Sequence, residues 1–306
     1  MALRRSIHII LNPVAGARRS YLLHDLIARL EKAGAAVTLV ETSGPGDATL
    51  LAKRAAMGNP DTLPDVIVAA GGDGTINEVA RGLTGQSIPL GIVPLGTANV
   101  LAIELGLRPR AAEIATMLLA GPARIMGTGL VQGRLFLLMV GIGFDGRVIH
   151  TVNPSLKHRF GKGAVIWAGI KAWARGPGQS MRLIVDGREK QAQWVVVLNG
   201  RYFAGPYVLA QSGDITEPGL TLFLFRHGSR SAFARYLLAL GLGRVERLSD
   251  VEVIAARHVE IIAADRASSH IEVEVDGDAA GVLPQVIEQG TKILRLVVPS
   301  SFGDKN

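Results

Sequence analysis

The chain has 306 residues, which at roughly 100–200 residues per domain suggests two domains. Apolar residues make up 48% and charged residues 19%, enough for sizeable cores and too few charges for a disordered chain. The absence of cysteine excludes disulfides, thiol nucleophiles and Cys-ligated zinc or iron–sulfur sites. The net charge of +7 favours anionic partners: nucleotides, a membrane surface or nucleic acid.

The first ten residues are a basic segment followed by a short strand-like run, which does not match a signal peptide. The most apolar stretch, residues 135–144, is much shorter than the ~20 residues that a membrane crossing needs. We therefore expect a cytoplasmic protein.

The first half of the chain alternates strand patterns with helix patterns. The apolar spacing predicts strands at 7–11, 37–40, 66–70 and 90–93, and helices at 21–33, 48–57, 76–83 and from about 100 to 106. This alternation is typical of an α/β domain with a parallel sheet that is covered on both faces.

The second half is dominated by short strand patterns separated by Gly, Pro and Asp. Strands are predicted at 135–140, 182–185, 194–198, 220–225, 258–263, 271–275 and 293–298, with helices near 163–175 and 231–242. We expect a β-rich domain of antiparallel sheets, a sandwich or an open barrel. The predicted domains are residues 1–128 and 129–306.

A glycine-rich loop, Gly71-Gly72-Asp73-Gly74-Thr75, lies where an apolar strand meets a helix. Open α/β sheets bind ligands at this edge, and glycines let backbone N–H groups approach phosphate oxygens. The Asp73 carboxylate would repel phosphate unless a cation bridges them, which points to Mg²⁺-nucleotide chemistry. A plain strand-to-helix turn, with Asp73 or Thr75 as helix cap, is the alternative.

The wider pattern resembles the diacylglycerol kinase catalytic-domain family, which includes bacterial lipid kinases and sphingosine kinases. The resemblance rests on three segments: Leu11 to Gly16, Gly71 to Val79 and Pro94 to Asn99. NAD kinases and phosphofructokinases share the Gly-Gly-Asp-Gly loop, but the Asn-Glu that follows it is similar to the lipid kinases. The resemblance implies an α/β nucleotide-binding domain, a β-rich lipid-substrate domain, and ATP in the cleft between them.

The resemblance also assigns residues. Those expected to bind the nucleotide are Asn12, Thr42, Gly71, Gly72, Asp73, Gly74, Thr75, Ile76, Asn77, Glu78 and Thr97, with Asp73 also holding metal through Mg²⁺-ATP. Thr42 is equally well explained as a turn residue. The family usually has Ser where this chain has Ala15, and Asp where it has Val100.

Residues 270–278 alternate, with Ile271, Val273 and Val275 on one face and acidic residues on the other. The family has Asp-Gly-Glu at the end of this run, and its Glu is proposed as the general base. This chain offers Asp278, which is one methylene shorter, with Asp276 as second choice; an ordinary hairpin turn is the alternative. Asp145, in a Gly-Phe-Asp segment of the family, is expected to hold metal, orient the substrate hydroxyl or stabilise a turn.

Some bacterial members of the family bind a structural Mg²⁺ beside an Asp-Gly-Leu turn. The corresponding stretch here is 214–220, and Pro218 stands where the Asp would be. Since proline supplies no ligand, we expect a solvated turn rather than a metal site.

Six basic residues and two tryptophans between 157 and 175 are typical of a helix lying on an anionic membrane, or of one packed on the β-rich domain. No nucleic-acid-binding motif appears. The sequence does not determine the oligomeric state, and a homodimer is one option.

The leading hypothesis is an ATP- and Mg²⁺-dependent lipid kinase, peripheral on the membrane, that phosphorylates diacylglycerol or a related lipid alcohol. A kinase of a soluble acceptor such as NAD is one alternative. A non-catalytic nucleotide or lipid sensor is the other, favoured by Val100, Pro218 and Asp278.

Overall fold

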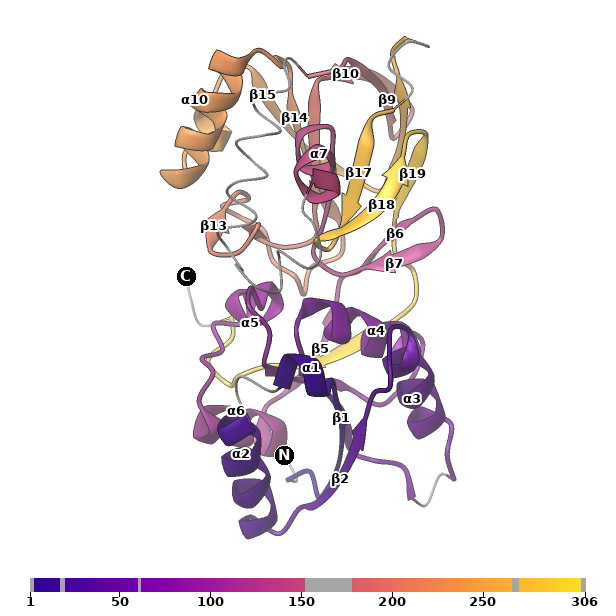
Figure 1. Ribbon diagram of the computed structural model, residues 1–306, viewed down its shortest axis with the longest axis vertical. Helices are drawn as coiled ribbons and strands as arrows, with labels where there is room; N and C mark the ends of the chain where they lie inside the picture. The colour runs from indigo at the N-terminus through magenta and orange to yellow at the C-terminus, as the bar shows by residue number, and fades with distance from the viewer. Residues whose placement is uncertain (1–2, 17–19, 60–61, 152–177, 266–269, 304–306) are drawn as a thin grey trace. The chain divides into compact units, whose positions relative to one another are not determined.

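The computed structural model describes residues 3–16, 20–59, 62–151, 178–265 and 270–303 (Figure 1). The chain divides into two compact units. Unit 1 comprises residues 1–127 and 291–306, and unit 2 comprises residues 128–290. The helix predicted near 163–175 lies outside the described residues.

Unit 1 is built on a six-stranded sheet with the order β2-β1-β3-β4-β20-β5. Its strands are β1 (Ser6–Leu11), β2 (Ala36–Glu41), β3 (Val66–Gly71), β4 (Leu90–Pro94), β5 (Ala123–Met126) and β20 (Leu294–Val297). The first four strands run parallel. Every residue of β3 and β4 is buried, as expected for central strands that are covered on both faces.

Helices cover both faces of this sheet. They are α1 (Pro13–Gly16), α2 (Ser20–Lys32), α3 (Asp47–Ala56), α4 (Asp73–Leu83), α5 (Val100–Glu104) and α6 (Ala111–Ala120). Helices α2 and α6 pack together on one side, and α3 and α4 on the other (Figure 1). Helices α3 and α4 approach closely at Gly82, where an added Cβ would lie 2.6 Å from the Thr49 carbonyl oxygen. The predicted α/β fold is confirmed.

The predicted second domain of residues 129–306 is wrong at its end. The last strand, β20, returns to unit 1, parallel to β4 and antiparallel to β5. The strand itself agrees with the apolar pattern, and its residues Leu294, Leu296 and Val297 are fully buried. An apolar strand pattern does not identify the neighbouring strand, so the change of unit at residue 291 escaped prediction.

Unit 2 contains two six-stranded sheets with the orders β10-β9-β16-β19-β6-β7 and β15-β14-β11-β8-β17-β18. The strands of the first are β6 (Gly129–Val131), β7 (Arg134–Phe136), β9 (Met181–Val185), β10 (Arg188–Ala192), β16 (His258–Ala263) and β19 (Gln285–Gln289). Those of the second are β8 (Met139–Ile142), β11 (Trp194–Leu198), β14 (Leu220–Phe225), β15 (Val251–Ala256), β17 (Glu272–Val275) and β18 (Asp278–Val282). A two-stranded ribbon joins β12 (Tyr202–Phe203) and β13 (Tyr207–Val208).

The two larger sheets enclose one apolar core. Val140 and Val197 come from one sheet, and Leu183, Ile261 and Ile287 from the other; all are fully buried. Neighbouring strands within each sheet run antiparallel. The predicted β-rich domain is therefore confirmed as an antiparallel sandwich.

In the described part of unit 2, helices α7 (Phe144–Thr151) and α10 (Arg230–Gly241) and a 3-10 turn, η3 (Val245–Arg247), accompany the sheets. Phe144 of α7 and Phe233 of α10 both contact Trp194, with ring centroids 5.6 Å away in each case. Trp194 is stacked on Phe225 at 4.0 Å. This aromatic cluster holds both helices to the sandwich. Among the described residues, no helix has the length and apolar character to cross a bilayer.

Candidate functional site

Four loops that follow the parallel strands of unit 1 meet at one edge of the sheet. Backbone hydrogen bonds extend the strand ladder into these loops: Thr42 N to Leu11 O at 2.8 Å, Asn12 N to Ala70 O at 2.9 Å and Leu95 N to Gly71 O at 2.9 Å. The carboxyl edge of such a sheet is where ligands bind. The structure thus brings together the predicted segments at residues 12, 42, 71–75 and 94–99.

Asn12 and Thr75 connect two of these loops. Asn12 Nδ2 donates to Thr75 Oγ1 at 3.1 Å, and Asn12 Oδ1 accepts from Val14 N and Ala15 N at 3.1 and 3.3 Å. Thr75 is buried, and an added Cβ on Gly71 would lie 2.5 Å from its hydroxyl oxygen. A larger residue at position 71 would therefore clash with Thr75. The Thr75 side chain links the glycine-rich loop to the loop that contains Asn12.

The glycine-rich loop and the loop after β4 come into backbone contact. An added Cβ on Gly96 would lie 2.5 Å from the Cα of Gly72. An added Cβ on Gly74, by contrast, would meet open space, at the first turn of α4. Thr97 is exposed. Backbone N–H groups of a first helical turn lack partners within the helix, so this turn offers donors to an anion.

Asp73 is the first residue of α4, so the helix starts three residues earlier than predicted. Its Oδ1 accepts from Leu101 N at 3.3 Å, at the beginning of α5. Burial raises the pKa of Asp73, and hydrogen bonds from the backbone of residues 99–101 oppose that effect. The side chain of Val100, where the family has Asp, is buried. At the start of α5, the carboxylate is therefore that of Asp73, because Val100 has none.

Three predicted residues of α4 take part in packing. Ile76 and Asn77 are buried, so any contact of Ile76 with a nucleotide falls to its backbone. Glu78 Oε1 accepts from Gly46 N at 2.9 Å, which ties α4 to the loop that contains Thr42. Thr42 itself is half-buried.

In unit 2, Asp276 has a structural role. Asp276 and Gly277 form the two-residue turn between β17 and β18, with φ angles of 51° and 87°. The Asp276 carboxylate accepts hydrogen bonds from the backbone N–H groups of Leu137, Leu138 and Met139, at 2.8, 2.8 and 3.0 Å. This use of both oxygens argues against Asp276 as the base.

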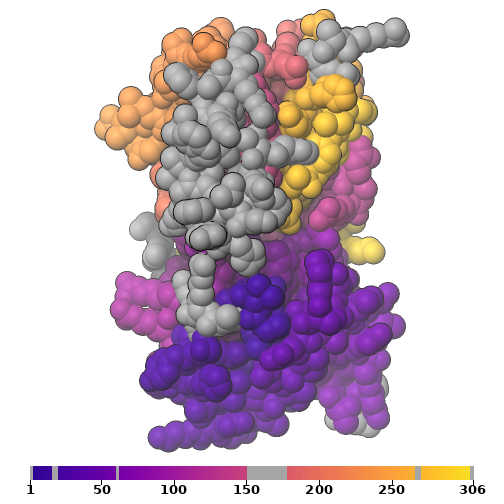
Figure 2. Space-filling view, in the orientation of Figure 1, coloured from indigo at the N-terminus to yellow at the C-terminus, as the bar shows by residue number. Residues whose placement is uncertain are grey.

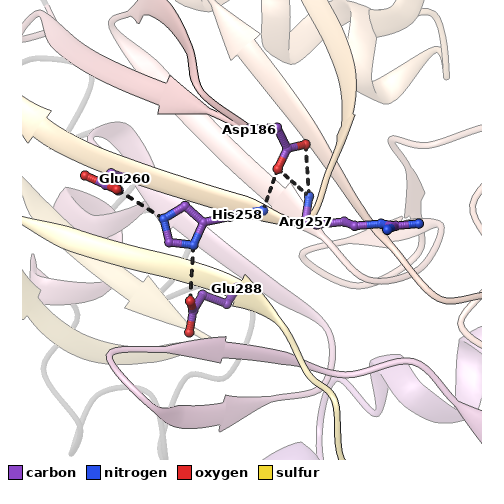
Figure 3. Close-up of polar contacts among 5 residues, drawn as sticks. All are labelled: Asp186, Arg257, His258, Glu260 and Glu288. Atoms are coloured by element: carbon purple, nitrogen blue, oxygen red, sulfur yellow. Dashed lines mark hydrogen bonds and ion pairs between the residues drawn. The ribbon is translucent and has the colours of Figure 1, made fainter.

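A second Asp-Gly turn in the same unit works in the same way. The carboxylate of Asp186 accepts from the backbone N–H groups of Arg257 and His258, at 3.3 and 2.9 Å (Figure 3). The His258 ring bridges Glu260 and Glu288, at 3.2 and 3.1 Å, and these carboxylates raise the pKa of His258. The group lies at the surface and links β16 to β19 and to the turn that follows β9. In both Asp-Gly turns of this sandwich, the Asp carboxylate therefore fixes the turn to the backbone of a neighbouring segment.

Asp278, the predicted base, stands directly after the Asp276–Gly277 turn. It is the first residue of β18, is paired with Val275, and has an exposed side chain. Glu274 Oε2 accepts from Gly277 N at 2.8 Å, and this hydrogen bond fixes the turn that precedes Asp278.

Glu274 belongs to a buried acidic pair that sequence reasoning did not identify. Asp145 Oδ2 and Glu274 Oε1 lie 2.7 and 2.9 Å from the position where a Cβ on Gly141 would stand. Trp194 Nε1 donates to Asp145 Oδ2 at 2.7 Å. Burial raises the pKa of Asp145 to about 7, against the hydrogen bond from Trp194, and raises that of Glu274 well above its ordinary value, where the charge of Asp145 adds to the effect. The alternation of residues 270–278 places Glu274 on the acidic face, but it does not reveal that α7 covers that face.

The acidic residues of the turn at 214–220 lie at the surface. Asp214 Oδ1 accepts from Thr216 N and Thr216 Oγ1, at 2.8 and 2.7 Å, and the Asp214 and Glu217 side chains are exposed. Nowhere in the described part of the chain do three His, Asp or Glu side chains gather in a way that could hold a metal ion.

Comparison with known proteins agrees with this architecture. Residues 6–131 match the model of the diacylglycerol kinase catalytic domain, and residues 138–298 match that of the YegS C-terminal NAD kinase beta sandwich-like domain. A diacylglycerol kinase of Bacillus subtilis (strain 168) is 29% identical over 307 residues, covering 97% of both chains. A diacylglycerol kinase of Staphylococcus aureus (strain MRSA252) is 26% identical over 287 residues, covering 92% of this chain and 89% of the relative.

A solved structure described as a diacylglycerol kinase from Bacillus anthracis str. Sterne has the same fold. It superposes with a TM-score of 0.71 at 21% identity and covers 99% of each chain. Each part of the sequence matches a domain of these kinases, and the relatives match over nearly the whole chain. The chain therefore belongs to the diacylglycerol kinase catalytic-domain family of kinases.

Proposed function

We propose that this protein is an ATP-dependent lipid kinase that transfers the γ-phosphate to a hydroxyl group of a membrane lipid, diacylglycerol or a related lipid alcohol. The observation that carries the proposal is the open glycine-rich turn between β3 and α4, at the carboxyl edge of the parallel sheet. The names of the relatives from Bacillus subtilis and Staphylococcus aureus support diacylglycerol as the acceptor.

The first turn of α4 is assigned to the phosphates of ATP. A Cβ added on Gly74 would meet no atom within 4 Å, so this turn is open there, and the positive end of the helix dipole favours anions. The Asn12–Thr75 hydrogen bond keeps this turn in place before the nucleotide arrives. Such preorganised donors stabilise the charge that develops on the transferring phosphoryl group.

Asp73 is assigned to the metal that accompanies ATP. Mg²⁺ prefers oxygen ligands and is commonly bound through one or two carboxylates plus substrate phosphates, which fits a turn with a single carboxylate. When bound, Mg²⁺ would neutralise charge on the terminal phosphates. Hydrogen bonds from the α5 backbone orient the carboxylate of Asp73.

Asp278 is assigned as general base. It would accept the proton of the lipid hydroxyl as the hydroxyl oxygen bonds to the γ-phosphorus, while the bond from that phosphorus to the bridging oxygen breaks and ADP leaves. Its exposed side chain supports this role, and the buried Glu274 acts by fixing the turn before it. Asp145 and Glu274 are therefore positioning residues.

A soluble acceptor such as NAD is the second candidate, because the model that matches unit 2 is described as NAD kinase-like. A non-catalytic nucleotide sensor is the third, because Val100 and Asp278 depart from the family pattern. The molecule that receives the phosphate, a lipid, NAD or none, distinguishes these three candidates.

The test is transfer of radiolabelled phosphate from ATP with Mg²⁺. The acceptors are diacylglycerol, ceramide, a sphingoid base and phosphatidylglycerol in anionic mixed micelles, with NAD as the soluble acceptor. Asp73→Asn and Asp278→Asn are compared with the wild type and with Glu217→Gln, an exposed acid of unit 2 outside the proposed site. Labelled lipid from the wild type and from Glu217→Gln supports the proposal, and label in NAD alone contradicts it.

A further inference from the structure

Helix α10 and its C-terminal cap residue carry three exposed leucines. Leu237, Leu238 and Leu242 are 41%, 65% and 60% exposed, although each belongs to a residue type that is usually buried. Leu238 and Leu242 are one turn apart, so their side chains lie on the same side of the helix. Figure 2 shows α10, in orange, projecting at the margin of unit 2.

The opposite side of the same helix is firmly anchored. Phe233 and Tyr236 are fully buried, and the Phe233 ring lies 4.8 Å from that of Phe144. Tyr236 contacts Phe225 at 4.9 Å, and its hydroxyl donates to Asp250 Oδ2 at 2.5 Å. Ser229 caps the helix by accepting from Ala232 N. The leucines are thus displayed on a rigid element.

The surroundings of this patch are basic. Residues 230–247 contain four arginines, Arg230, Arg235, Arg244 and Arg247, and one acidic residue, Glu246. All four arginines are exposed, and Arg235 is paired with Asp250. Arg230 is the first residue of α10, and no acidic residue lies in the first turn. A cation there opposes the helix dipole.

Another basic and apolar surface lies on α3 and is less compact. Leu50 and Met57 are 54% and 65% exposed, but they are two turns apart along the chain, with Lys53 and Arg54 between them. The long side chains of lysine and arginine cover apolar surface on a helix. The α3 surface therefore serves as the matched control for α10.

We propose that α10 docks unit 2 onto an anionic lipid surface, with Leu237, Leu238 and Leu242 entering the interfacial region and the arginines contacting the headgroups. An amphipathic helix with a basic border binds membranes in this way, through buried apolar area and attraction to anionic lipid. Basic residues add to this attraction individually. The proposal gives the protein a docking surface other than residues 157–175.

A second copy of the chain fits this patch less well. A self-association would bring four arginines toward four arginines, and like charges facing each other are unfavourable. Helix α10 has only 12 residues and is therefore about 18 Å long. A stable protein interface buries on the order of 1,200–2,000 Å² in total, which is more than three leucines supply.

Vesicle co-sedimentation tests the proposal without any need for catalysis. The full chain is mixed with vesicles of phosphatidylglycerol and phosphatidylcholine, or of phosphatidylcholine alone. The variants are Leu238→Ser with Leu242→Ser, Arg244→Gln with Arg247→Gln, and, as control, Leu50→Ser with Met57→Ser. Near-ultraviolet circular dichroism confirms that each variant is folded, and light scattering gives its mass.

We expect the leucine variant to bind anionic vesicles about tenfold or more weakly, and the arginine variant to lose much of the preference for phosphatidylglycerol. The α3 control should bind as the wild type does. The proposal is overturned if the α10 leucine variant binds normally, if only the α3 variant loses binding, or if the α10 variant converts a dimer to a monomer.

The choice of a lipid surface rests on the proposed function, but the two fail separately. Normal vesicle binding by the α10 variants would remove the docking surface and leave phosphate transfer intact. Loss of transfer to every hydroxyl lipid by a protein that still binds vesicles through α10 would remove the kinase and leave the docking surface.

Discussion

Asp145 and Glu274 meet beside Gly141, each with a carboxylate oxygen where a larger residue on β8 would place its Cβ. One comes from the start of α7 and the other from the middle of β17, so the pair joins a helix to the sheet beneath it. Both carboxylates are buried, and the charge of Asp145 adds to the effect of burial in raising the pKa of Glu274. Because Glu274 also accepts from Gly277 N, the pair lies under the turn that precedes Asp278.

Replacing Asp145 with Asn should flatten the dependence of stability on pH. The pKa of Asp145 is raised from an ordinary value of 3.8 to about 7, so the folded state holds a proton that the unfolded state loses. Stability therefore falls as pH rises from about 4 to about 7. At about 1.4 kcal/mol per pKa unit, the loss is on the order of 4 kcal/mol.

Asp145→Asn keeps an oxygen for Trp194 Nε1 and removes the charge. Urea unfolding of the variant at pH 5, 6, 7 and 8 should show a shallower decline than in the wild type. An unchanged slope in the variant would mean that Asp145 is already ionised throughout this range.

Asp276→Ala and Asp278→Ala should separate structure from chemistry. Asp276 satisfies three backbone N–H groups, and leaving buried donors unpaired costs about 1–3 kcal/mol each. We expect Asp276→Ala to destabilise unit 2 by several kcal/mol and Asp278→Ala to change stability by less than about 0.5 kcal/mol. Chemical denaturation of both variants makes the comparison. Equal stabilities would refute the structural role of Asp276.

Asn12→Ala should weaken ATP binding without unfolding unit 1. The change removes the bond to Thr75 Oγ1 and the two bonds from Val14 N and Ala15 N, which together order the loop beside the glycine-rich turn. We predict an increase of roughly tenfold in the dissociation constant for ATP, on the scale of one net hydrogen bond. Isothermal titration calorimetry measures it. Ser20→Ala, an exposed change at the start of α2, should leave the constant unaltered.

Asp73→Asn should separate folding from metal-dependent transfer. An amide oxygen can still accept from Leu101 N, so the start of α5 should remain in place. Without the negative charge, we expect an unchanged melting temperature and a loss of Mg²⁺-dependent transfer of about 100-fold or more, the scale of other electrostatic contributions to catalysis. Retention of full activity at limiting Mg²⁺ would remove Asp73 from the metal site.

Much of this architecture could be predicted from the sequence. The period of apolar residues identifies most strands, and the glycine-rich loop after β3 marks the edge of the sheet at which we propose that the nucleotide binds. The return of β20 to unit 1 could not be predicted. The apolar residues Leu294 and Leu296 indicate a buried strand, but they do not indicate which strands it pairs with. The Asp145–Glu274 pair was also missed, because residues 129 positions apart in sequence meet only through the packing of α7 on β17.

The most direct test of the account is the transfer of γ-phosphate from ATP with Mg²⁺ to diacylglycerol in anionic mixed micelles, by the wild type and by Asp278→Asn. The account predicts labelled phosphatidic acid from the wild type, and at least 100-fold less from a variant that is folded and binds ATP normally. A folded, ATP-binding wild type that labels no hydroxyl lipid would contradict the kinase. Equal rates for the two proteins would contradict the assignment of Asp278 as the base.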